Sequence, residues 1–267
     1  MSEPSAASDR AQKDRERFVA FAFCWADVLL ELDGEGRIAY AAGTTQTFTG
    51  KTPDKLSGVE FDKPAPGEEL NASGEATVPR QAASVILLRG GSEALELLLV
   101  QRTPQARFMG GFWVFPGGAV DAHEGEGDEA HRLAAVRELE EEASVGGITP
   151  HELVKFSRWI TPAVVQIRFD THFFLAPAPA DAAPVVDGSE IVDLVWHTPQ
   201  SALEAYGREE LPLVFPTIKH LEQFSAFESA DALIGHAAQR TVEAVEPRIL
   251  MEGEVARVLL PGEPGYD

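Results

Sequence analysis

The chain has 267 residues, of which 44% are hydrophobic and 24% are charged, a composition typical of a globular protein with one large domain or two small ones. Acidic residues outnumber basic ones by 43 to 22, and the net charge of −21 disfavours binding to nucleic acid or to an anionic membrane. The single cysteine, Cys24, excludes a disulfide within the chain and a multi-cysteine zinc site. Because residues 2–17 are polar and no apolar run reaches membrane-spanning length, we expect a cytoplasmic protein.

The first 79 residues have a separate pattern. We expect residues 1–17 to form a disordered tail and residues 62–79, rich in Pro, Gly and acids, to form a linker. Between them, residues 28–32 and 37–40 flank an Asp-Gly-Glu-Gly turn and predict a β-hairpin. Residues 18–61 resemble the first half of a PAS sensory domain. At about 45 residues they are too few for a complete one, so we favour a packed PAS-like α/β fragment over a working sensor.

The remainder, residues 80–267, mixes strands and helices without regular alternation, which favours an α+β fold with a mixed sheet. Apolar, β-branched and aromatic runs predict strands at residues 82–88, 95–100, 169–175, 191–196 and 254–260. Helices are predicted at residues 199–206 and 217–240, the second as part of a C-terminal helical extension.

An acidic helix carries the chemistry. Between Asp121 and Glu142 there are nine acidic and only two basic residues. On a helix, Glu138, Glu141 and Glu142 fall at i, i+3 and i+4 and share a face. The opposite face is expected to bury four apolar side chains: Leu133, Val136, Leu139 and Ala143.

Three neighbouring carboxylates repel one another unless a cation lies among them. Arg137 can pair with Glu141 at i+4 but neutralises only one charge. Hard divalent cations prefer oxygen ligands, and Mg²⁺ is commonly held by a few carboxylates together with substrate phosphates. The sequence therefore favours metal-assisted hydrolysis of a phosphate ester or anhydride over a merely solvated acidic face.

This segment resembles the Nudix box, the signature of Nudix hydrolases. The pattern Gly, five residues, Glu is met by Gly118 and Glu124, and residues 137–145 match its Arg-Glu-apolar-x-Glu-Glu end. Two departures occur: five extra residues precede Arg137, so that either Glu124 or Glu129 is the first box glutamate, and Ser144 replaces the final glycine.

The resemblance implies a Nudix fold, a mixed β-sheet sandwiched between helices. It also implies Mg²⁺ or Mn²⁺ bound by Glu138, Glu141 and Glu142, with Arg137 orienting the glutamates. The general base varies within the family, and Glu142, Glu124 and Glu190 all stay open.

Upstream of the box, residues 98–118 resemble the motif of the coenzyme A diphosphatase branch. The matching positions that matter for binding are two arginines, whose planar guanidinium groups suit phosphate, and the Phe-Pro-Gly-Gly sequence at the end. On this likeness we expect substrate-binding roles for Arg102, Arg107, Phe115, Gly117 and Gly118.

The favoured function is hydrolysis of a diphosphate linkage in a nucleoside diphosphate derivative, with coenzyme A or an acyl-coenzyme A as substrate. Alternatives are a Nudix hydrolase for NDP-sugars, dinucleotides or damaged nucleotides, and a non-catalytic nucleotide-sensing regulator. A zinc peptidase is disfavoured because His123 and His131 lack the His-Glu-x-x-His spacing. We expect a small-molecule diphosphate partner, neither nucleic acid nor membrane, and leave a homodimer open.

Overall fold

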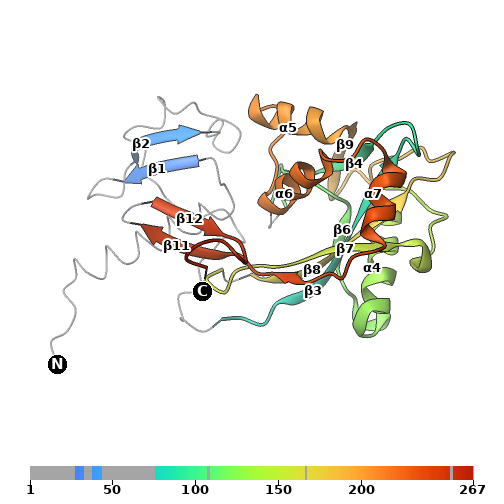
Figure 1. Cartoon of the computed structure of the whole chain (residues 1–267), viewed down its shortest axis with the longest axis horizontal. Helices are drawn as coiled ribbons and strands as arrows, with labels where there is room; N and C mark the ends of the chain where they lie inside the picture. The colour runs from blue at the N-terminus through green and yellow to red at the C-terminus, as the bar shows by residue number, and fades with distance from the viewer. Residues whose placement is uncertain are drawn as a thin grey trace. The chain divides into compact units, whose positions relative to one another are not determined.

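The computed structural model describes residues 28–32, 38–43, 76–106, 109–165, 167–252 and 255–266 (Figure 1). The chain divides into two compact units, of which the larger comprises residues 78–161 and 168–245. The smaller comprises residues 1–77, 162–167 and 246–267. The tail, linker and domain limits expected from the sequence stay predictions.

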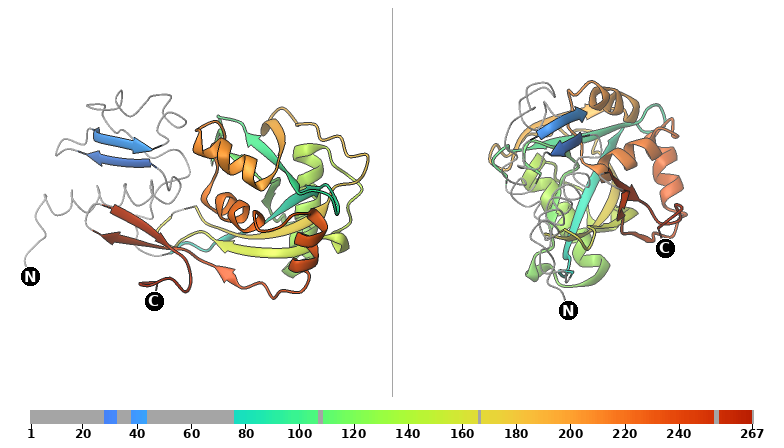
Figure 2. Two further views of the ribbon diagram at one scale, coloured as in Figure 1. Left: turned by 45° about the horizontal axis from the view of Figure 1, so that its top comes forward. Right: turned by 90° about the vertical axis from the view of Figure 1, so that its left-hand side faces the viewer.

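Two hairpins are described in the smaller unit. Strands β1 (Val28–Leu32) and β2 (Ile38–Gly43) pair antiparallel, which confirms the predicted hairpin. The rest of the PAS-like stretch lies outside the described residues, so that likeness stays a prediction. Strands β11 (Arg248–Glu252) and β12 (Val255–Leu259) form the second antiparallel pair, visible in Figure 2, and β12 confirms the late strand.

The larger unit is built on an eight-stranded sheet with the order β10-β7-β8-β3-β4-β5, to which β6 adds on β3 and β9 on β4. The β3–β8 and β10–β7 pairs are parallel and the others antiparallel, which confirms the mixed sheet. The strands are β3 (Arg80–Arg89), β4 (Glu96–Arg102), β5 (Trp113–Val114), β6 (Gly117–Ala119), β7 (Val154–Ile160), β8 (Phe169–Pro177), β9 (Ile191–His197) and β10 (Ala244–Val245).

Helices cover both faces of this sheet. Successive strand residues point to opposite faces, and Phe173 and Phe174 of β8 show what lies on each. Phe174 joins a core cluster with Leu139 and other residues of α4 (Gly127–Ala143). The Phe173 ring instead lies 4.6 Å from that of His220, on α6 (Phe215–Phe224). The predicted sandwich is therefore confirmed, with α4 below and α6 above the strands in Figure 1.

The C-terminal helical region differs in one respect from the prediction. Helix α5 (Pro199–Gly207) occurs where expected. The single helix predicted over residues 217–240 is wrong, because α6 ends at Phe224 and α7 (Ala230–Ala237) starts anew. The break is explained by Ser229, whose side chain accepts a hydrogen bond from the Ala232 amide and caps α7. No helix in the described part of the chain is long and apolar enough to cross a membrane.

Helix α4 is less amphipathic than its sequence suggests. Leu133, expected to be buried, is 38% exposed, whereas Glu142, on the carboxylate face, is buried. The helix packs against β3 and β8 but also against β6 and the 3₁₀ turns η1 (Ala122–Glu124) and η2 (Pro150–Glu152). Leu139 and Ala143 are buried as predicted and Val136 packs partly buried against the core, so the predicted apolar face is wrong at Leu133 alone. The elements around the helix also bury Glu142 on the acidic face.

Helix α4 ends at Ala143 and is capped by Ser144, which has a left-handed backbone conformation (φ 55°, ψ 30°). The Ser144 amide donates a hydrogen bond to the Glu140 carbonyl. A glycine fits this position without strain, whereas a left-handed L-residue costs about 1 kcal/mol. We expect Ser144→Gly to raise the free energy of unfolding by about 0.5–1 kcal/mol, measured by chemical denaturation. Ser144→Ala keeps the strain and should give no gain, and equal stabilisation by both variants would contradict this account.

Candidate active site

The acidic end of α4 packs against the glycine pair of β6. A Cβ on Gly117 would lie 2.4 Å from the backbone carbonyl oxygen of Ala83, on β3. A Cβ on Gly118 would lie 2.2 Å from a carboxylate oxygen of Glu138. The first contact is with backbone, which cannot move cheaply, and the second is with the end of a flexible side chain, so glycine matters more at residue 117 than at residue 118.

Arg137 is the centre of the hydrogen-bond network. Its Nη1 atom donates to Glu138 at 2.8 Å and to Glu141 at 2.9 Å, and its Nε atom donates to Glu124 at 2.9 Å. Nη2 donates to the Ala119 carbonyl at 3.0 Å. Hydrogen bonding to Glu124 is the largest cause of a raised pKa for Arg137, which keeps its charge fixed. One guanidinium thus connects the helix, the loop before it and strand β6.

The structure separates the two candidates for the first box glutamate. Glu124 accepts two hydrogen bonds from Arg137, and its side chain is only 4% exposed. Burial alone would raise the pKa of Glu124, but the bonds from Arg137 and the Asp121 amide outweigh it and lower the pKa. Glu129 is exposed at the start of α4. Glu124 is therefore the glutamate that the fold brings to Arg137.

Glu142 lies on the inner side of the helix. Its carboxylate accepts a 2.8 Å hydrogen bond from the Gly117 amide and lies 3.9 Å from Nη1 of Arg102. Burial, together with the negative charges of Glu138 and Glu190, raises the pKa of Glu142 to about 8. Burial is also the largest cause of a raised pKa for Glu138.

Glu190, distant in sequence, belongs to the same acidic cluster, because its charge contributes to the raised pKa of both Glu138 and Glu142. Its backbone is fixed on both sides. The Asp187 carboxylate accepts a hydrogen bond from the Glu190 amide at 2.9 Å, and the Glu190 carbonyl accepts one from the Thr103 amide at 2.7 Å. Glu138 and Glu142 thus lie against the glycines of β6, Glu141 shares Arg137 with Glu138, and the charge of Glu190 acts on Glu138 and Glu142. We call these four residues the acidic cluster.

These oxygen donors suit a hard divalent cation. Among the described residues, however, no three His, Cys, Asp or Glu side chains are already placed around a common metal position. The hydrogen bonds explain this, since Glu138 and Glu141 are bound to Arg137 and Glu142 is bound to the Gly117 amide. The chemistry of the donor set fits the predicted metal, whose ligands stay a prediction.

The residues expected to bind substrate differ in their burial and in whether the structure describes them. Arg102 lies beside Glu142 with its side chain 22% exposed, whereas Arg107 lies outside the described residues. Phe115 is 3% exposed, and its ring packs edge-on against Phe173 at 6.5 Å. The Phe115 ring is therefore part of the core, and its expected contact with substrate stays a prediction.

One residue of the network was missed from the sequence. Asp121 starts the 3₁₀ turn η1, and its amide donates to the Glu124 carboxylate at 2.6 Å in a capping box. Its own carboxylate lies 4.0 Å from Arg137 Nε. The Asp-x-x-Glu spacing of residues 121–124 is a readable capping signal. It would have favoured Glu124 over Glu129.

A family model of the NUDIX domain matches residues 78–218, which include the helix, the loop and strand β6. The chain belongs to the Nudix family. A crystal structure of a Nudix hydrolase from Alicyclobacillus acidocaldarius is similar, with a TM-score of 0.53 and 26% identity over 60% of this chain and 96% of that one.

Two curated relatives extend the comparison. A putative nudix hydrolase 7 of Caenorhabditis elegans is 30% identical over 190 residues, covering 57% of this chain but only 62% of that protein. The human acyl-coenzyme A diphosphatase NUDT19 is 24% identical over 300 residues, covering 70% of this chain and 80% of that protein. The chain thus spans less than two thirds of the first of these Nudix relatives.

The two glycines of β6 predict different outcomes for an added methyl group. Gly117→Ala meets the backbone of β3, which cannot move cheaply, so we expect a loss of about 1–3 kcal/mol in the free energy of unfolding. Gly118→Ala meets the end of the Glu138 side chain, which can turn away, so a loss below about 1 kcal/mol is expected. Chemical denaturation of both variants gives the comparison, and a larger loss for Gly118→Ala would contradict it.

Proposed function

We propose that this Nudix protein is a metal-dependent hydrolase that cleaves the diphosphate of coenzyme A or an acyl-coenzyme A, releasing 3′,5′-ADP and a 4′-phosphopantetheine product. The observation that carries the reaction class is the gathering of Glu138, Glu141, Glu142 and Glu190 next to the glycine strand. Such oxygen-rich sites hold Mg²⁺ or Mn²⁺ together with phosphates. When bound, a divalent cation would neutralise phosphate charge and polarise a phosphoryl oxygen.

The chain's own residues supply the positioning. Arg137 holds Glu138 and Glu141 side by side through Nη1, and Glu124 holds Arg137 through two hydrogen bonds. Because both carboxylate oxygens of Glu124 are bound by Arg137, we propose that Glu124 orients Arg137. The candidates for the general base are then Glu142 and Glu190. We assign the predicted metal-binding role to Glu138, Glu141 and Glu142.

The choice of substrate has two supports. The first is the register of Arg102, Gly117 and Gly118 with the coenzyme A diphosphatase motif. The second is the similarity to human acyl-coenzyme A diphosphatase NUDT19 over 70% of this chain. Arg102 offers a planar guanidinium suited to phosphate oxygens, next to the acidic cluster.

Turnover tests the proposal directly. The protein is incubated with Mg²⁺ or Mn²⁺ and coenzyme A, an acyl-coenzyme A, NADH, ADP-ribose or a diadenosine polyphosphate, and the products are separated by chromatography. We expect 3′,5′-ADP from the coenzyme A substrates at the highest kcat/KM, and no product after EDTA. Preference for another substrate would overturn the coenzyme A assignment, and no turnover of any would overturn the hydrolase.

A matched pair on α4 tests the residue roles. Glu141→Gln removes a carboxylate bound by Arg137 and should lower kcat/KM on the order of 100-fold. The control is Glu140→Gln, an exposed neighbour on the same helix, which should leave kcat/KM within about twofold. Equal activity of the two variants would remove Glu141 from the site.

A second pair tests the box glutamate. Glu124→Gln weakens the hydrogen bonds to Arg137 and should lower kcat/KM by about 10–100-fold, the usual effect of losing a residue that orients metal ligands. Glu129→Gln alters an exposed side chain and should have little effect. The reverse order of effects would assign the box glutamate to Glu129.

A further inference from the structure

A cavity of about 820 Å³ lies at the N-terminal end of α4. Its walls come from the start of β3, the loop of residues 119–127, the first turn of α4 and strands β7 and β8. Asp128 lines it, and Asp128 and Glu138 are ten residues or about 15 Å apart along the helix, so the cavity opens at the other end of α4 from the acidic cluster. The two share a border at Ala119 and Asp121, which also contact Arg137. The volume is within the usual range for small-molecule sites. We call it the α4 pocket.

Three cationic side chains line the α4 pocket: Arg80, Lys155 and Arg158. Arg158 is fixed by Asp170, to which Nε and Nη2 donate at 2.8 and 2.6 Å, which leaves Nη1 outside that pair. Lys155 is held by Asp128 at 2.9 Å. The side chain of Arg80 makes no hydrogen bond or ion pair with any residue that the structure describes. Two cations are thus held in place, and the third, exposed at the start of β3, has no side-chain partner among the described residues.

The acidic groups of the α4 pocket are largely matched. Asp128 accepts from both Arg132 and Lys155, and these contacts outweigh its burial and lower its pKa to about 2. Asp170, next to the pocket, is bound by Arg158 and by Gln81. The remaining acids lie towards the surface: Asp121, beside Arg137, and the exposed Glu126. Two carboxylates thus serve to fix the cations.

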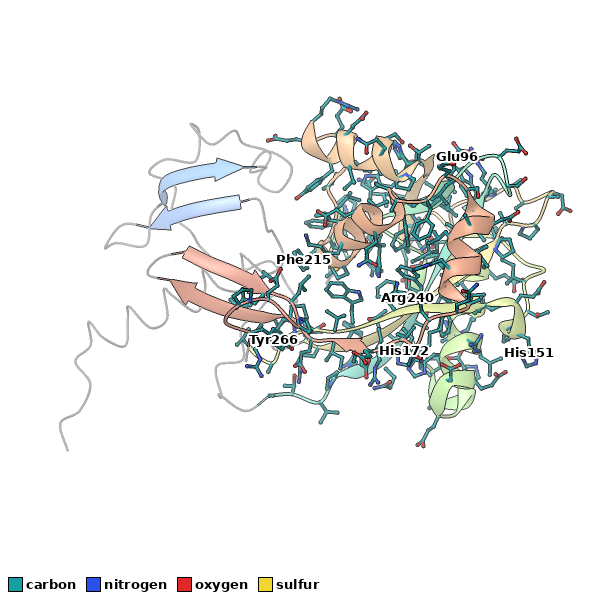
Figure 3. The ribbon with its side chains drawn as sticks, in the orientation of Figure 1. Glu96, His151, His172, Phe215, Arg240 and Tyr266 are labelled. Carbon is teal, nitrogen blue, oxygen red and sulfur yellow. The ribbon has the colours of Figure 1, made fainter. Side chains whose placement is uncertain are left out.

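Two stacked histidines complete the wall. The rings of His131 and His172 lie 3.7 Å apart and nearly parallel. Both ring nitrogens of His131 are within hydrogen-bond distance of partners, Gly127 and Gln81. His172 is 6% exposed, and neither of its ring nitrogens has a hydrogen-bond partner among the described residues. The His172 Nε2 atom lies 3.8 Å from an Asp170 carboxylate oxygen and both ring nitrogens are buried, so the stacked rings serve as a flat wall of the pocket (Figure 3 labels His172 on the sheet near α4).

We propose that the α4 pocket binds the phosphate of a small ligand, at a site distinct from the one that cleaves diphosphates. Arg80, Lys155 and the free edge of Arg158 supply charge-assisted donors. Ala119, Val120, Ala122 and Ala130 supply an apolar wall for the body of the ligand. In a chain of net charge −21, the three cations of this lining equal its three acids, Asp121, Glu126 and Asp128. The proposal does not depend on the proposed hydrolytic function.

The test measures binding without turnover. Isothermal titration calorimetry in EDTA follows AMP and inorganic phosphate binding to the full chain, because without metal the acidic cluster repels both probes. We expect saturable binding of AMP, weakened at least about tenfold by Arg80→Gln. The control is Arg89→Gln, at the other end of β3, where the arginine pairs with Glu96 outside the pocket, and binding should be unchanged. Circular dichroism checks that each variant folds.

Three results would overturn the α4 pocket as a phosphate site: no saturable binding of either probe, equal affinity in the Arg80→Gln variant, or equal weakening by Arg89→Gln. A loss of AMP binding in Glu138→Gln would also overturn it, because the ligand would then lie at the acidic cluster. Binding that persists while no diphosphate is hydrolysed supports the pocket and rejects only the hydrolase.

Discussion

The hydrogen bonds of the Arg137 guanidinium are the constraint on which the acidic end of α4 depends. Glu138 and Glu141 lie close enough on the helix to repel, and Arg137 donates to both from one nitrogen. Its other nitrogens reach Glu124 and the Ala119 carbonyl, so the same group fixes the loop and strand β6. Removing this one cation would remove hydrogen bonds to α4, to the loop before it and to strand β6 together.

The sheet fixes the other side of the same site. Strand β6 pairs with β3 at Ala82–Ser84, where glycine at residue 117 allows the β3 backbone to approach, and the Glu138 carboxylate lies against Gly118. The Gly117 amide then donates to Glu142, so the strand binds the helix directly. Residues 117–119 are thus joined to α4 by two hydrogen bonds, one from the Gly117 amide to Glu142 and one from Arg137 to the Ala119 carbonyl.

Local spacing predicted the parts of the site that lie on one element. The i, i+3 and i+4 glutamates, the glycine turn before them and the strands of the sheet all have short-range patterns. Non-local packing decided the rest. Leu133 is exposed and Glu142 buried because η1, η2 and β6 surround α4, and Phe115 is buried because α6 covers the other face of the sheet. None of these contacts leaves a periodic signal in the sequence, which is why the exposure of Leu133 and the burial of Glu142 and Phe115 could not be predicted from it.

The five extra residues in the loop show how a longer Nudix box keeps its geometry. Counting from Arg137 pointed to Glu129, but spacing along the chain does not measure distance once η1 folds Glu124 back to Arg137. Gly125 and Gly127 both have positive φ, which lets the chain turn sharply before α4 begins. The same residues line the α4 pocket. The loop of residues 119–127 therefore brings Glu124 to Arg137 on one side and lines the α4 pocket on the other.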